Sequence, residues 1–280
     1  MLVGSCLSLI GVGAIIVDVV RYKRLRTLVG RPIAPLLYRS ACDGVFASMF
    51  LVAHIFLAED SDPLTQRTIF DEGTCIRLAF MTQVVLLAGE CWYLVVSIDV
   101  IVDLVASPFN DATTRVVIYH TFIWCFSISM GVVLLKDDEA GQSTVFNWCW
   151  RRNFAAEDQD NDQLAGFLYL YGEVVLIYSF SLVVWFLARV SLNKGIPRTY
   201  RVREQRIMQG KGIVLGFSVY WSVFGALYSI VLFADNSGSK TTGLWIWVWL
   251  GFSLLLCSRG LVDFFIWKLY HLRNITIVID

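Results

Sequence analysis

The sequence predicts an all-α membrane protein, a seven-transmembrane-helix bundle with its N-terminus outside and its C-terminus in the cytoplasm. Three observations predict this fold class. Of the 280 residues, 57% are hydrophobic and only 16% are charged, against about 25% in soluble domains. The apolar residues gather in seven runs with the charged residues between them, as a multi-span membrane protein requires. Lysine and arginine, finally, concentrate on one predicted side of the membrane.

The seven runs are expected to form one domain over residues 1–280. Most are long enough to cross a bilayer at a rise of about 1.5 Å per residue. The last three runs do not repeat the first three, and no broken-helix pattern is visible, which argues against a transporter. We expect helices at about 2–20, 36–58, 75–104, 115–135, 164–188, 212–234 and 243–268.

The first run begins at the N-terminus, so a cleaved signal peptide is the alternative to a first helix. No basic segment precedes the run, whereas five basic residues follow it directly, and a signal peptide has the reverse order. We therefore expect a true first helix with almost no extracellular segment before it. The five basic residues are Arg21, Lys23, Arg24, Arg26 and Arg31.

The orientation follows from the positions of the basic residues. With the N-terminus outside, the cytoplasmic loops and tail hold 16 of the 23 lysines and arginines, Arg39 among them, and the outer loops hold five. This positive-inside bias places the C-terminus in the cytoplasm. The outer loops are acidic instead. Attraction of a cationic ligand is one interpretation of these acidic residues, and ordinary solvated loops are the simpler one.

The run 75–104 is predicted to be the central helix because it contains buried charge. An ionised carboxylate at mid-membrane costs about 2.5–3.5 kcal/mol, so Glu90 should face protein and not lipid. Glu90 and Asp99 are nine residues apart, which places them on opposite sides of a helix with 100° per residue. Each carboxylate therefore has its own partner, or is protonated because burial favours the neutral form.

Three further residues give the membrane interior a polar character. Asp43 in the second helix belongs either to a polar network that switches the bundle or to a simple buried hydrogen bond. His120 and Trp124 lie one turn apart on the fourth helix, where they could face Glu90 or Trp92. The same spacing also fits plain helix packing.

Two of the seven cysteines are expected on the outer side of the membrane. Cys75 lies at the outer end of the third helix and Cys149 in the second outer loop, 136–163. An oxidising compartment favours a disulfide between them, and the alternative is two unpaired thiols. The tryptophans of the same side, with Trp150 and Trp247 among them, are expected to form an aromatic collar at the membrane interface.

The third inner loop, 189–211, is strongly basic. Gly195 fits a helix stop, and Pro197 fits the first turn of the next helix, which would then extend into the cytoplasm. Its basic face would suit an acidic partner protein or anionic membrane lipid, or it would only set the topology. The predicted contact residues are Arg198, Arg201, Arg203 and Arg206.

Seven short motifs follow one another along almost the whole chain. They are Glu90-Cys91-Trp92-Tyr93-Leu94 through Asp99 to Ser107-Pro108-Phe109, His120 with Trp124, Trp148-Cys149-Trp150, Gly195-Ile196-Pro197-Arg198-Thr199 with Arg203, Tyr220-Trp221, Gly260-Leu261-Val262 and Phe265-Ile266-Trp267. In this order they resemble the cAMP-receptor-like group of G-protein-coupled receptors, a branch related to secretin-type receptors. The absence of Asp-Arg-Tyr after the third helix and of Asn-Pro-x-x-Tyr in the seventh agrees with that group and argues against a rhodopsin-like receptor.

The resemblance implies a plasma-membrane receptor that transduces an extracellular signal to a heterotrimeric G protein. The same helices occur in receptors fused to a phosphatidylinositol phosphate kinase domain, and Leu272-Arg273 looks like the start of their linker. The alternatives are therefore the sensor half of such a fusion, without its kinase domain here, or a seven-helix transporter or scaffold. The candidate switch residues inside the membrane are Asp43, Glu90, Trp92, Asp99, His120, Trp124 and Trp221.

Other classes of function fit the sequence poorly. A zinc hydrolase needs about three converging histidines, but His54, His120 and His271 fall in different parts of the predicted bundle. A retinal protein needs a lysine in the middle of the seventh helix, and Lys268 lies at its inner end. We expect no catalytic residues, metal, cofactor or nucleic-acid partner. The extracellular ligand is not identified.

Overall fold

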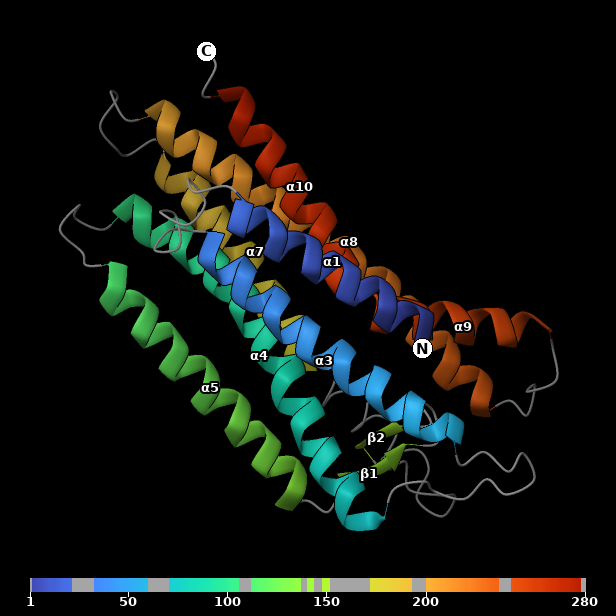
Figure 1. Ribbon diagram of the computed structural model, residues 1–280. Helices are drawn as coiled ribbons and strands as arrows, with labels where there is room; N and C mark the ends of the chain where they lie inside the picture. The colour runs from blue at the N-terminus through green and yellow to red at the C-terminus, as the bar shows by residue number, and fades with distance from the viewer. Residues whose placement is uncertain are drawn as a thin grey trace.

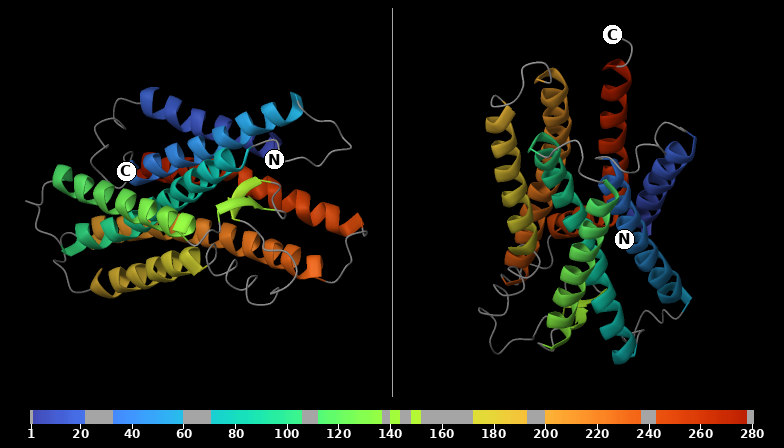
Figure 2. Two further views of the ribbon diagram at one scale, coloured as in Figure 1. Left: turned by 90° about the horizontal axis from the view of Figure 1, so that it is seen from below. Right: turned by 90° about the vertical axis from the view of Figure 1, so that its left-hand side faces the viewer.

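The computed structural model describes residues 2–21, 33–59, 71–105, 112–136, 140–143, 148–151, 172–192, 200–236 and 243–277. These residues form eight helices that run roughly alongside one another and one β-hairpin at an end of the bundle (Figures 1 and 2). The elements are α1 (Leu2–Arg21), α3 (Ile33–Glu59), α4 (Glu72–Val105), α5 (Ala112–Lys136), β1 (Ala140–Ser143), β2 (Trp148–Arg151), α7 (Glu173–Leu192), α8 (Tyr200–Asn236), α9 (Gly243–Cys257) and α10 (Arg259–Ile277).

Five of the described helices, α1, α3, α4, α5 and α7, are long and apolar enough to cross a membrane, and the bent pair α9–α10 would add a sixth. Their outer faces expose large apolar side chains, such as Leu176, which is 71% exposed. In water such a surface would be unfavourable, whereas lipid solvates it. The prediction of a helical architecture is therefore confirmed, and these helices are compatible with the predicted multi-pass membrane protein. The prediction of seven spans stays a prediction, because the apolar part of α8, Lys211–Leu227, is shorter than a span.

The helix bounds follow the apolar runs closely, with two extensions and one gap. Helix α10 continues to Ile277, beyond the predicted end at 268. Helix α8 begins at Tyr200, well before the apolar run 212–234, so the predicted extension of this helix is present. The beginning of the run 164–188 lies outside the described residues, and α7 is described from Glu173.

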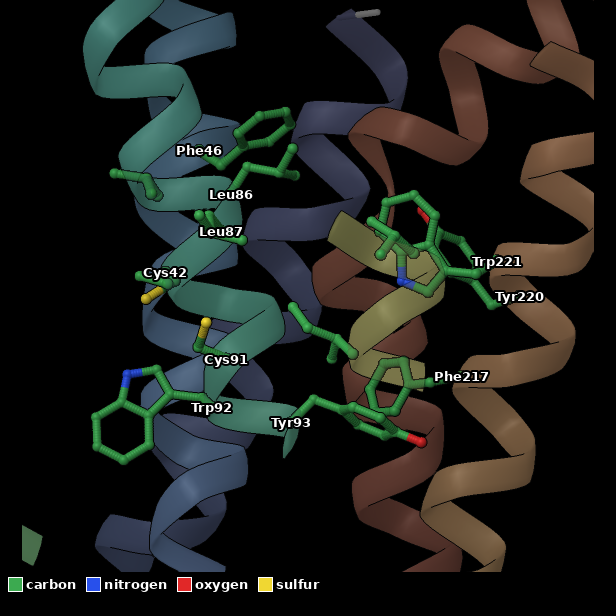
Figure 3. Packing of buried hydrophobic residues seen from close by; sticks show 14 of the residues in the cluster. Cys42, Phe46, Leu86, Leu87, Cys91, Trp92, Tyr93, Phe217, Tyr220 and Trp221 are labelled. Atoms are coloured by element: carbon green, nitrogen blue, oxygen red, sulfur yellow. The ribbon is translucent and has the colours of Figure 1, made fainter. Parts of the chain in front are cut away.

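Helix α4 is the centre of the bundle, as its sequence predicts. It contacts α3, α5, α7, α8 and both strands, and every residue from Thr82 to Tyr93 is buried. Trp92 and Tyr93 point to different sides of α4 (Figure 3). Tyr93 stacks on Tyr178 of α7 at 4.5 Å between ring centroids and meets Phe217 of α8 at 5.3 Å.

The run 243–268, expected as one unbroken helix, is two helices that meet at Ser258 with a bend of 58°. A break leaves backbone groups without their usual partners inside the helix, and side chains of neighbouring helices bond to two backbone groups beside the break. One of them, the Leu255 carbonyl, also accepts from the Ser258 N–H at 3.2 Å. The Tyr220 hydroxyl of α8 donates to the Leu255 carbonyl at 2.8 Å, and the Gly260 N–H donates to Ser8 Oγ of α1 at 2.8 Å. Because these partners come from distant parts of the chain, the sequence pattern of this run alone did not reveal the break.

Helix α1 packs closely against α10 through two glycines. A Cβ atom at Gly11 would lie 2.4 Å from the Gly260 carbonyl oxygen, and a Cβ at Gly260 would lie 2.6 Å from the Ser8 carbonyl oxygen. Further along the same two helices, Lys268 Nζ lies 2.7 Å from Asp18 Oδ2. The contacts advance together along both helices, so α1 and α10 run parallel.

The β-hairpin is fixed to the start of α4. Strands β1 and β2 pair antiparallel, and Cys149 of β2 forms the predicted disulfide with Cys75, with 5.0 Å between their Cα atoms. Trp150 does not belong to an interface collar as expected: it is only 4% exposed and donates to Gln83 Oε1 of α4 at 2.8 Å. Trp247 of α9, by contrast, is 74% exposed.

Candidate functional site: a buried ionic cluster

Five charged side chains meet in the middle of the bundle, where α3, α4 and α10 approach one another. Each is at most 1% exposed. Charges buried to this degree are costly unless they are paired and hydrogen-bonded, so their contacts determine whether the bundle is stable. We call this group the ionic cluster, and its members are Arg39, Asp43, Glu90, Arg259 and Asp263.

Glu90 is the hub of the ionic cluster because it accepts from donors on four other helices. Arg39 Nη1 of α3 donates to Glu90 Oε2 at 3.0 Å, and Arg259 Nη2 of α10 donates to Oε1. The Tyr178 hydroxyl of α7 and Trp221 Nε1 of α8 both donate to Oε2, at 2.9 and 3.1 Å. A carboxylate facing two guanidinium groups and two neutral donors is held ionised.

The two arginines connect Glu90 to the remaining carboxylates. Arg39 Nε donates to Asp263 Oδ1 at 3.1 Å, and Arg259 Nη2 lies 2.9 Å from Asp43 Oδ1. Aromatic rings cover the arginine faces: the Arg39 guanidinium lies 4.0 Å from the centroid of Phe217. This cation–π contact replaces part of the lost hydration.

The charge pattern of two helices builds the ionic cluster. Arg39 and Asp43 are four residues apart on α3, as Arg259 and Asp263 are on α10, and this spacing places each pair on one helix face. The prediction that Arg39 lies on the cytoplasmic side is wrong, because α3 begins at Ile33 and buries Arg39. Asp263 was not among the predicted site residues, and no role was predicted for Arg259. Opposite charges at this spacing inside an apolar run are the signal that could have identified them.

Asp99 has partners of its own, as predicted from its position opposite Glu90. The Tyr119 hydroxyl of α5 donates to Asp99 Oδ1 at 2.8 Å, and Arg115 Nη1 lies 3.5 Å from the same oxygen. This group joins α4 to α5 and does not belong to the ionic cluster.

Of the two residues predicted on the fourth helix to face Glu90 or Trp92, His120 makes aromatic contacts and Trp124 is exposed. His120 of α5 meets both Trp92 of α4 and Tyr38 of α3 at 4.5 Å between ring centroids. Trp124 is 37% exposed. His120 thus packs α5 against α3 and α4. The hydrogen-bond donors to Glu90 described above include neither His120 nor Trp124.

The predicted cytoplasmic contact residues lie at or before the start of α8. Arg201, Arg203 and Arg206 are in its first turns, and their side chains are not among those described. Arg198 lies outside the described residues.

The ionic cluster ties the described helices α3, α4, α7, α8 and α10 to one carboxylate. Removing one partner of a buried ion pair costs about 3–5 kcal/mol because the other charge stays buried. A network of this kind changes only between discrete arrangements. Within the described parts of the chain, no group of three histidines, cysteines or carboxylates could hold a metal ion.

No protein-family model matches the chain, and no curated protein matches its sequence. The ionic cluster and the helices that it connects are therefore the features from which a function can be inferred.

Proposed function

We propose that this chain is a seven-helix G-protein-coupled receptor of the cAMP-receptor-like type, which transduces an extracellular signal across the plasma membrane to a heterotrimeric G protein. One observation carries the proposal: Tyr178 of α7 and Trp221 of α8 both donate to Glu90 Oε2. A signal that moves α7 and α8 away from α4 must break both hydrogen bonds. The ionic cluster would thereby hold the receptor in its resting state.

The direction of the helices supports a receptor topology. Because α1 and α10 run parallel, an odd number of crossings separates them in a membrane. Helices α3, α4, α5, α7 and α8 supply five, provided that α8 crosses with residues beyond its apolar stretch Lys211–Leu227. The positive-inside bias then puts the N-terminus outside and the C-terminus in the cytoplasm.

The β-hairpin β1–β2 lies at the proposed outer end of this bundle, where a signal would be received. The disulfide fixes β2 to α4, and Trp150 reaches Gln83, whose Nε2 donates to Glu173 Oε2 of α7 at 3.1 Å. The β-hairpin is thus connected to α7, one of the two helices that must move. A ligand that displaces Trp150 would act on α7 through Gln83.

The inner end offers a contact surface for the G protein. Helix α8 extends beyond its apolar stretch, and this extension carries Arg201, Arg203 and Arg206, with Arg198 just before it. Movement of α8 would reposition these basic residues. An acidic surface of the G protein would complement them.

The experiment that tests this proposal measures nucleotide exchange on purified heterotrimeric G proteins of several classes, with the receptor in lipid nanodiscs. We expect the double variant Arg203→Glu, Arg206→Glu to abolish the exchange that the wild-type chain stimulates. The variant Arg151→Glu, Arg152→Glu changes the same number of charges on the proposed outer side and should leave exchange unchanged. Equal exchange in both variants and wild type would remove α8 from the coupling surface.

A second function, proton-coupled transport, is favoured by one observation. The broken pair α9–α10 places Arg259 and Asp263 inside the bundle, and transporters often build ion sites at such breaks. Proteoliposomes with an internal pH dye distinguish the two functions. Sustained proton flux that Asp263→Asn abolishes would favour transport, whereas a receptor shows none.

A further inference from the structure

The ionic cluster contains more negative than positive groups. Two arginines face three carboxyl groups, so the cluster has a net charge of −1 if all five are ionised. An uncompensated charge is very unfavourable at a site that excludes water, and such a group is neutralised instead. The other titratable side chains around the cluster must enter the same balance. They are Cys42 of α3, Cys91 and Tyr93 of α4, Tyr178 of α7 and Tyr220 of α8, all neutral acids that add no positive charge.

The hydrogen bonds of Ser40 indicate which of the three carboxyl groups is neutral. Ser40 Oγ lies 2.9 Å from the Leu36 carbonyl oxygen and 3.1 Å from Asp263 Oδ2. A serine hydroxyl has one hydrogen to donate and two lone pairs that accept. It cannot donate to both oxygens. If Asp263 Oδ2 carries a hydrogen, it donates to Ser40 Oγ, and Ser40 donates to Leu36.

The neighbouring carboxylate supports the same assignment. Asp43 Oδ2 lies 3.8 Å from Arg39 Nε, the atom that also contacts Asp263. Because an oxygen of each carboxyl group lies within 3.8 Å of this one nitrogen, the Asp43 and Asp263 carboxyl groups are neighbours. Two adjacent carboxylates in such a site do not both ionise. Asp43 is the ionised member because two arginines face it, Arg259 at 2.9 Å and Arg39 at 3.8 Å, whereas within the described residues the ion pair of Asp263 is with Arg39 alone.

We propose that the folded protein binds one proton on Asp263, between α3 and α10, which makes the ionic cluster electrically neutral. The remaining charges are then two arginines against Asp43 and Glu90. The inference rests on burial, charge and hydrogen-bond geometry, and does not depend on coupling to a G protein. Any rearrangement that separates α10 from α3 would expose this proton to exchange.

Infrared spectroscopy of the protein in lipid nanodiscs tests the proposal. We expect the wild-type spectrum at neutral pH to contain the carbonyl band of a protonated carboxylic acid, which shifts in D2O. The band should be lost in Asp263→Asn and kept in Asp99→Asn. A wild-type spectrum from which Asp263→Asn removes no such band would overturn the proposal.

Melting temperatures give a second, independent test. An asparagine at position 263 can donate to Ser40 and accept from Arg39, as the protonated acid does, so Asp263→Asn should keep the wild-type melting temperature. The same change at Asp43 removes an ionised partner of Arg259 and should lower it. Equal losses in the two variants would mean that Asp263 is ionised.

The wild-type protein alone distinguishes a proton from a metal cation. A sodium ion between the two carboxylates would also neutralise the cluster. We expect the melting temperature to be the same in sodium chloride and in choline chloride at equal ionic strength. A specific stabilisation by sodium would contradict the proposal and assign the site to that ion.

Discussion

The stability of the bundle depends strongly on Glu90, because donors from four helices converge on its two oxygens. The same residue in an isolated helix would be an unfavourable charge in lipid. Its burial is acceptable only while Arg39 and Arg259 remain in place. Each of these three residues is therefore more important for stability than its size suggests.

We expect Glu90→Gln to destabilise the protein by about 3–5 kcal/mol, because two arginines lose their shared anion and remain buried. The measurement is the midpoint of thermal unfolding in lipid nanodiscs. Asp99→Asn is the matched control on the same helix: its partner Arg115 has a side chain that is 21% exposed, so water can compensate. Equal losses for the two variants would show that Glu90 is not the hub.

At this scale, the sequence predicts which residues matter better than it predicts their partners. The cost of a charge in lipid identifies Glu90, Asp43 and Asp99, and helical geometry separates Glu90 from Asp99. The partners of Glu90 lie 51 to 169 residues away along the chain. Such distances exceed any local pattern, and Arg39 was assigned to a loop because it stands close to one.

Helices α1 and α10 make the tightest helix contact at any described glycine, judged by how close an added Cβ atom would come to the neighbouring helix. Gly11 and Gly260 allow the two backbones to approach so closely that a methyl group at either position would overlap a carbonyl oxygen. Small residues commonly serve this purpose between helices in membranes. The contact holds α10 where Arg259 and Asp263 reach α3 and α4.

We expect Gly11→Ala to destabilise the protein by about 1–3 kcal/mol, the range for overpacking, because its Cβ would lie 2.4 Å from the Gly260 oxygen. Gly13→Ala, two residues later on the same helix, is the control. No atom lies within 4 Å of its added Cβ, and alanine favours the helix by up to about 1 kcal/mol. Unfolding midpoints that fall equally would rule out the close approach.

The elements were largely predictable, since apolar runs and caps are local features. The break at Ser258 was not, because Tyr220 and Ser8 supply the hydrogen bonds that make it possible. Trp150 was misassigned for a similar reason. A tryptophan in an outer loop has the composition of an interface anchor, and only the disulfide and Gln83 bring it inside.

In the proposed receptor, the β-hairpin, the ionic cluster and the basic extension of α8 lie in this order along the membrane normal. Its proposed orientation requires the β-hairpin and the segment between α7 and α8 to lie on opposite sides of the membrane. The parallel course of α1 and α10 is consistent with this arrangement.

Labelling of single introduced cysteines checks the orientation. In a Cys6→Ser, Cys125→Ser background, we expect Ser143→Cys to react with a membrane-impermeant maleimide on intact cells. Asn193→Cys should react only after permeabilisation. The reverse pattern would invert the topology and place the basic extension of α8 outside.

In the proposed receptor, the ionic cluster controls the position of the inner end of α8. Trp221→Phe removes one hydrogen bond to an ionised group, worth about 1.5–3 kcal/mol, and so favours the state in which α8 has moved. The decisive measurement is basal G-protein nucleotide exchange in nanodiscs for Trp221→Phe, with and without Arg203→Glu, Arg206→Glu. We predict exchange above wild type for Trp221→Phe and loss of that increase in the combined variant. Exchange at the wild-type rate in correctly folded Trp221→Phe would contradict the account.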